Sequence, residues 1–170
     1  VNQSVVANTS ATSGEDRSSA AISIEFEDMQ IEAGQTFDLT VAGDAFNNVY
    51  GYQFTLETKG LELVTVQSGA VNVGEENFGV HGNAVTTSWN SDQPVNATGT
   101  LFTMTFKANT SGLVSELLDV NSEITRAEAY VGSNLDIVDI DLAKGADADV
   151  DFSLFQNGPN PFTTNTVIGF

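Results

Sequence analysis

The feature that most constrains the fold is an alternation of apolar and polar side chains with a period of two residues, which begins at Ile22 and recurs along the chain as far as Leu142. In its first segment, Ile22, Ile24 and Phe26 share one face, and the polar Ser23 and Glu25 share the other. Successive side chains of a β-strand point to opposite faces, so this period is typical of a strand with one buried face.

Segments of the same kind follow, separated by clusters of Gly, Asn, Asp and Ser. After a turn at 31–35, strands are predicted at 37–41, ending at Gly43-Asp44, and at 52–57, 61–66, 84–89, 101–107, 116–120, 124–131 and 135–142. The Lys59-Gly60 pair suggests a hairpin turn, and segment 124–131 also fits a brief helix. No stretch has a convincing helical period, so the sequence predicts an all-β fold of two packed antiparallel sheets with about nine strands.

Charge and composition limit the possible partners. Lys and Arg number 5 against 23 Asp and Glu, which gives a formal net charge of -18 that would repel nucleic acid and anionic membrane surfaces. No apolar run approaches the about 20 residues of a membrane span, so we expect no membrane insertion. The chain has no Cys, which excludes disulfides, thiolate metal sites and cysteine nucleophiles.

The sequence divides into four predicted parts. Residues 1–20 form a polar tail or linker, whose Val5 and Val6 could add an edge strand to a sheet, and residues 21–143 form the sandwich. An acidic linker at 144–151 precedes a distinct segment at 152–170. The chain starts at Val1 without a signal sequence, so we expect that a signal peptide has been removed or that a longer protein precedes it.

The last segment, FSLFQNGPNPFTTNTVIGF, resembles the opening of the C-terminal sorting domain of the type IX secretion system in Bacteroidota. The residues that carry the resemblance are Phe155, Gln156, Asn157, Pro159, Asn160, Pro161 and Phe162. Pro159 and Pro161 fix their own backbone φ angles and favour extended conformations in the residues before them, which predicts a rigid elbow between two strands. Gly158 stands where the family has a bulky residue, and the later strands of the sorting domain are missing.

Residues 20–142 resemble cohesins and their carbohydrate-binding relatives. The similarity lies in the runs 34–37, 51–56, 61–63, 88–89 and 99–107. It implies an antiparallel, two-sheet jelly-roll sandwich of about nine strands, and the cohesin family binds dockerin modules. We therefore expect a cohesin-like fold.

No catalytic constellation stands out. His81 is the only histidine, in a stretch that looks like a loop, and we interpret it as a solvated residue. Ser88 or Ser91 could be combined with His81 and Asp92, yet no nucleophile motif surrounds either serine. Glycoside hydrolysis needs two facing carboxylates, and no motif selects a pair among 23 acidic residues. We predict that the chain is not an enzyme.

Two acidic sets are candidate calcium ligands, because Ca²⁺ prefers carboxylate and other oxygen ligands. They are Asp136, Asp139 and Asp141 near the end of the sandwich, and Asp147, Asp149 and Asp151 in the acidic linker. Neither set has the glycine turn and distal Glu of a calcium-binding loop, so solvated faces are the favoured interpretation and no cofactor is required.

Aromatic side chains suggest a possible ligand face. Trp89, Tyr50 and Tyr130, with Tyr52, could stack on sugar rings. Trp89 and Tyr52 also alternate with polar neighbours, which favours core positions for both.

These features predict a secreted or cell-surface module that serves adhesion, scaffolding or protein binding, with the type IX translocon as its partner during export. Two alternatives remain. One is a filament subunit that pairs with copies of itself through strand addition, and the other is a polysaccharide-binding module of a larger secreted enzyme.

Overall fold

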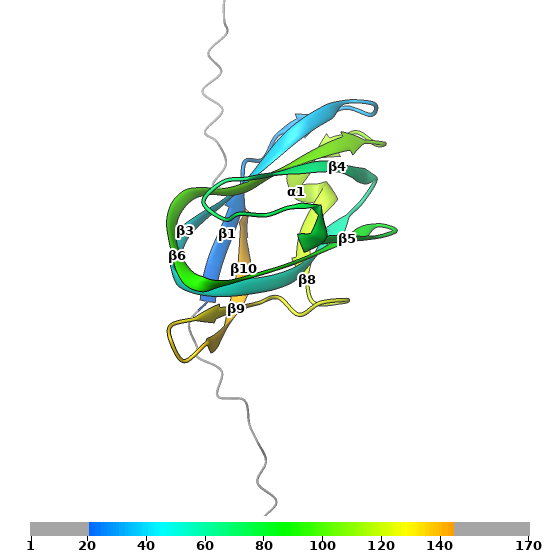
Figure 1. Cartoon of the computed structure of the whole chain (residues 1–170). Coiled ribbons are helices and arrows are strands. Elements are labelled where there is room, and N and C mark those ends of the chain that lie inside the picture. The colour runs from blue at the N-terminus through cyan, green and yellow to red at the C-terminus, as the bar shows by residue number, and fades with distance from the viewer. Residues whose placement is uncertain (1–20, 145–170) are drawn as a thin grey trace, which may run out of the picture.

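The computed structural model describes residues 21–144, which form a β-sandwich with one short α-helix and one 3₁₀ turn (Figure 1). The elements are β1 (Ala21–Phe26), β2 (Gln30–Ile31), β3 (Thr36–Thr58), β4 (Leu61–Ser68), η1 (Glu75–Asn77), β5 (Phe78–His81), β6 (Ala84–Ala108), β7 (Gly112–Leu113), α1 (Val114–Leu117), β8 (Leu118–Asn121), β9 (Glu128–Val131) and β10 (Asp136–Lys144).

Two long strands organise the sandwich. β3 has 23 residues and β6 has 25, and they pair antiparallel along most of their length. Their register shifts between Val41 and Gly51, and here the ribbon curves from one layer into the other, as Figure 1 shows at the left. β-bulges allow such a bend because each inserts an unpaired residue and raises the local twist.

The predicted strand ends inside this ribbon are therefore wrong. Gly43 does not end a strand but pairs with Gly99 within the bend, where two residues without side chains allow the backbones to curve. Segments 84–89 and 101–107 likewise belong to one strand, β6. Glycine marks an irregularity in both long strands, and sequence alone does not distinguish a bend from an end.

The two layers are halves of one rolled sheet. One layer contains β4, the second half of β6, the first half of β3, and β1. The other contains β5, the first half of β6, the second half of β3, β8 and β9. β10 pairs with both β9 and β1 and so joins the layers. The all-β jelly-roll sandwich expected from the sequence is confirmed, with ten strands in the part of the chain described.

One pairing departs from the antiparallel prediction. β1 and β10 run parallel, from Ala21 beside Asp139 to Phe26 beside Lys144. The alternation of apolar and polar residues shows which face of a strand is buried but not the direction of the strand. The sequence therefore did not predict that β1 and β10 are parallel. As a result, the chain enters and leaves the described sandwich at opposite ends of one strand pair.

The core lies between the layers and follows the alternation. Ile22, Ile24 and Phe26 are buried, and the same holds for the predicted inward side chains of β3 and β6, namely Phe37, Leu39, Val41, Tyr52, Phe54, Leu56, Phe102, Met104 and Phe106. Each large apolar side chain contributes about 1.5 to 3 kcal/mol when fully buried. Tyr52 is the centre of an aromatic cluster, with its ring 5.7 Å from that of Trp89 and 6.1 Å from that of Phe102.

Three local predictions need correction. Lys59-Gly60 does not close a hairpin, because β4 pairs with β6 and the turn carries the chain between layers. The predicted strand 116–120 begins as α1 and continues as β8. Within 124–131 only β9 is a strand, and the residues before it form a loop that is tied to Thr55, whose Oγ1 accepts a hydrogen bond from the Thr125 N–H at 2.8 Å.

Candidate binding groove between the edge strands

β4 and β5 are each an edge strand of one layer. Within residues 21–144, each of them pairs with β6 alone, β4 with its second half and β5 with its first. Both edges lie on the same side of the sandwich, because β6 bends from one layer to the other. A gap between the two edge strands lies on that side.

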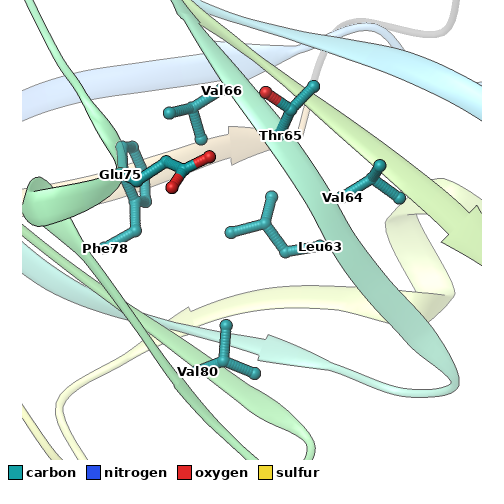
Figure 2. Close-up of a pocket in the computed structure, with 7 residues that line it drawn as sticks. All are labelled: Leu63, Val64, Thr65, Val66, Glu75, Phe78 and Val80. Carbon is teal, nitrogen blue, oxygen red and sulfur yellow. The ribbon is translucent and has the colours of Figure 1, made fainter.

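A groove of about 260 Å³ occupies this gap. Figure 2 shows the side chains that line it, from β4, η1 and β5. They are Leu63, Val64, Thr65, Val66, Glu75, Phe78 and Val80.

The groove has an apolar floor and an exposed apolar rim. Leu63, Val66 and Phe78 are partly buried and pack against the core. Val64 and Val80 are 55% and 62% exposed, which makes them the two most exposed large apolar side chains among the described residues. Contiguous exposed apolar surface of this kind often marks a binding site.

A β-bulge produces the position of Val64. Leu63 pairs with Phe106 and Thr65 with Thr105, so Val64 is the extra residue and has no partner on β6. Bulges re-aim a side chain and are frequent beside functional sites. The sequence carried a signal for this feature, since Val64 is an apolar residue at the position where the alternation of Leu61, Glu62 and Leu63 calls for a polar one. We did not identify the groove from that signal.

Glu75 is the only titratable side chain in the lining. Figure 2 shows its carboxylate projecting among Leu63, Val66 and Phe78. Its position is set by Asn77, whose Oδ1 accepts a hydrogen bond from the Gly74 N–H at 3.0 Å, and whose Nδ2 donates to the Ser88 carbonyl of β6 at 2.9 Å. These bonds hold η1 against the sheet.

The connection from β4 to η1 is anchored as well. Val71 and Val73 are buried in the core, and the Val71 N–H donates to the Leu101 carbonyl at 3.0 Å. The Ser68 hydroxyl accepts a hydrogen bond from the Val73 N–H at 3.0 Å and donates to the carbonyl of the same residue at 2.9 Å. Backbone hydrogen bonds therefore fix both walls of the groove, and the groove is preorganised for a ligand.

The polar groups of the lining are the Glu75 carboxylate and the Thr65 hydroxyl. One carboxylate without a second acid does not make an acid–base pair. In the part of the chain described, no group of three or more His, Cys, Asp or Glu side chains is placed to hold a metal ion. The arrangement suits an apolar side chain with a positive charge next to it.

A buried polar group on the outer face of the second layer was also missed from the sequence. Glu128 is only 7% exposed, and its Oε1 accepts hydrogen bonds from Gln53 Nε2 at 3.0 Å and from the Tyr130 hydroxyl at 2.8 Å. Gln53 and Glu128 are cross-strand partners on β3 and β9. A buried carboxylate needs such donors, and the cluster fixes the orientation of the Tyr130 side chain.

The structure places one of the three aromatic residues of the predicted ligand face, Trp89, in the core. Trp89 is 7% exposed and stacks on Tyr52, so its ring belongs to the core and is not presented to a sugar. Tyr50 and Tyr130 are half-buried. The Tyr130 ring lies over Gly51, where an added Cβ would come within 3.3 Å of it. Sugar binding by Tyr50 and Tyr130 stays a prediction.

The remaining candidates are placed as follows. Asp136, Asp139 and Asp141 lie on β10 and are exposed. His81 ends β5 rather than lying in a loop, and it is exposed, with its Nε2 3.3 Å from the Thr86 hydroxyl. Asp147, Asp149 and Asp151, and the sorting-motif residues from Phe155 to Phe162, lie outside the described residues.

Among residues 21–144 there is no helix long and apolar enough to span a membrane.

Comparison with solved structures finds cohesins. The similar chains include one from a type I cohesin–dockerin complex of Clostridium thermocellum, with a TM-score of 0.53 and 10% identity over 72% of this chain and 89% of that one. A second such complex from the same organism gives a TM-score of 0.51 and 9% identity over 73% of this chain and 100% of the other. A type II cohesin from Bacteroides cellulosolvens gives 0.52 and 14%, over 74% and 96%.

These similarities establish the fold of the described region as cohesin-like. At 9 to 14% identity they say nothing about which residues bind a partner. No family profile matches the sequence, and no curated protein matches it.

Proposed function

We propose that this chain is a non-enzymatic protein-binding module that acts as a scaffold or adhesion component outside the cell. Two of the structurally similar chains come from cohesin–dockerin complexes, in which the same fold serves protein recognition. The observation that carries the proposal is the preformed groove between β4 and β5, whose rim exposes Val64 and Val80. A surface with solvent-exposed apolar side chains is suited to binding a partner protein, which would bury them.

The test compares two aspartate substitutions in the rim with one elsewhere. Val64→Asp and Val80→Asp each place a charge where a partner would remove it from water, which costs binding energy. Ile124→Asp is the matched control, since Ile124 is 52% exposed and does not line the groove. Each tagged variant of the full chain is immobilised, and binding of surface-protein extract is compared by quantitative mass spectrometry.

We expect one or more proteins to be retained by the unmodified chain and by Ile124→Asp but lost from both rim variants. Thermal unfolding of all three variants separates lost binding from lost folding. Proteins retained equally by every folded variant would show that the groove is not the binding surface.

Export through the type IX secretion system is the second part of the proposal. It is supported by the sequence at 152–170, where Phe155 to Phe162 read F-Q-N-G-P-N-P-F and resemble the sorting domains of that system apart from Gly158. The test is expression of the full-length gene product in a bacterium with an active type IX system, with and without this segment. Loss of the protein from the cell surface and medium is expected on deletion, and unchanged export would refute the assignment.

Polysaccharide binding is a second candidate function, favoured by the Tyr130 ring that lies over Gly51 on the outer face. A panel of immobilised polysaccharides tests it, with Tyr130→Ala as the control variant. Binding that Tyr130→Ala leaves unchanged would exclude this face.

A further inference from the structure

We infer that the groove recognises a partner segment carrying an apolar side chain next to a lysine or arginine, with the apolar group inside the groove and the cation beside Glu75. This inference rests on the proposed protein-binding function and adds the chemistry of the partner.

The volume suits one side chain. An enclosed apolar cavity of about 150 Å³ holds one benzene molecule, so a groove of about 260 Å³ has room for an aromatic or branched aliphatic side chain. Leu63, Val66 and Phe78 offer it an apolar floor. The exposed Val64 and Val80 would be covered by the backbone and neighbouring residues of the same segment.

Glu75 supplies the polar part of the recognition. Its carboxylate lies in the lining, and no hydrogen bond or ion pair joins it to another residue within 21–144. Lys59 and Lys107 are two of the few cations in the described region, and neither lines the groove. Lys59 forms an ion pair with Glu57 at 3.4 Å, and Lys107 lies opposite Glu62 in the register of β4 and β6. No Lys or Arg whose side chain the structure describes within 21–144 lines the groove, so we expect the partner to supply the cation beside Glu75.

The charge of the whole chain selects among the possible occupants. With a net charge of -18, a second copy of this chain or an acidic protein would be repelled as it approached, whereas a basic segment would be attracted. Complementary charge raises the association rate and suppresses unsuitable partners. A basic, apolar segment satisfies both the local lining and the long-range field.

The experiment uses short synthetic peptides and the full chain labelled with ¹³C at its Val and Leu methyl groups. The peptides have a Ser/Thr host sequence, a central Phe, and Lys, Gln or Glu two residues away from it. NMR titration reports both the dissociation constant and the methyl groups that respond. Glu75→Gln removes the charge from the groove, and Glu76→Gln is the matched control, because Glu76 is also exposed but does not line the groove.

We expect the methyl groups of Leu63, Val64, Val66 and Val80 to shift, and the Lys peptide to bind about tenfold more tightly than the Glu peptide. Each exposed charge contact changes affinity by about two- to fivefold, so exchanging an attraction for a repulsion gives about this ratio. The ratio should fall about threefold in Glu75→Gln, in which the net charge of the chain still favours the Lys peptide, and it should persist in Glu76→Gln.

Three results would overturn the inference: no shifts at millimolar peptide, shifts centred on the outer face of β3 and β9, or a Lys preference that Glu75→Gln leaves intact. Failure of this inference can be distinguished from failure of the proposed protein-binding function. If the rim variants Val64→Asp and Val80→Asp abolish partner capture while the peptides show no charge preference, the groove binds proteins by another chemistry.

Discussion

At the scale of single residues, Tyr52 shows how the core accommodates a polar group. It is 2% exposed, its ring stacks on Trp89 and Phe102, and its hydroxyl is buried with no hydrogen-bond partner of ordinary geometry. The Thr87 hydroxyl is buried in the same way. Burial raises the pKa of the Tyr52 phenol far above its ordinary value, and Thr87 opposes the rise only weakly. Tyr52 therefore contributes to the core through the packing of its ring and not through its hydroxyl.

Tyr52→Phe should leave the free energy of unfolding at pH 7 unchanged within about 1 kcal/mol, or raise it, because the lost hydroxyl satisfies no partner. Above pH of about 10 the unfolded chain ionises this phenol whereas the folded chain keeps it protonated. The folded state then binds more protons, so the free energy of unfolding falls, by up to about 1.4 kcal/mol per pH unit.

Urea unfolding followed by Trp89 fluorescence between pH 7 and pH 11 measures this effect. The decline at high pH should be smaller in Tyr52→Phe than in the unmodified chain, whereas Tyr50→Phe, a change at a half-buried tyrosine, should retain it. Identical pH profiles for both variants would contradict the role given to burial.

At the scale of elements, the sequence predicted the buried faces of the strands better than the residues at which the strands begin and end. Alternation identified the buried sides of β1, β3 and β6 because burial imposes it directly on the side chains. It misplaced the ends at Gly43 and the partner of β4 after Lys59-Gly60, since both depend on how distant segments pack. The groove was missed for the same reason: Val64, Glu75 and Phe78 become neighbours only when β4 and β5 are brought to the same side by the bend in β6.

The turn between β3 and β4 gives a prediction at this scale. Gly60 has φ of +75°, and a Cβ there would lie 2.7 Å from Thr110 Cγ2. Gly82, in the turn between β5 and β6, has φ of +62°, but an added Cβ would meet nothing within 4 Å. Gly82→Ala should cost about 1 to 2 kcal/mol from backbone strain alone, and Gly60→Ala more.

Urea unfolding of both variants compares the costs directly. Adding Thr110→Ser to Gly60→Ala removes the methyl group in the way and should recover part of the difference. Equal costs for the two glycines, or no recovery in the double variant, would show that contact with Thr110 does not matter.

At the scale of the whole molecule, the excess of acidic residues opposes compactness. A folded chain of net charge -18 holds like charges closer together than the unfolded chain does. Salt screens this repulsion, with a Debye length of about 10 Å at 0.1 M and about 3 Å at 1 M. The free energy of unfolding should therefore rise between 0.02 and about 0.5 M NaCl, as measured by urea titration.

A comparison of CaCl₂ with MgCl₂ at equal ionic strength extends the experiment to the predicted calcium ligands, Asp147, Asp149 and Asp151 or Asp136, Asp139 and Asp141. Equal rises mean screening alone, whereas an additional rise with Ca²⁺ would support a specific site. Stability that is flat or falls with NaCl would contradict the repulsion argument.

The parallel pairing of β1 with β10 has a mechanical consequence. Ala21 and Lys144 lie at opposite ends of six matched residue pairs. Tension applied between these two points drags the strands past each other lengthwise, so the ladder yields only when several of its bonds break together. An arrangement in which both ends met at one side would instead unzip bond by bond. If a module with this arrangement is tethered at one end and pulled at the other, the force loads the β1–β10 pair in shear, the direction in which the pair resists separation more strongly.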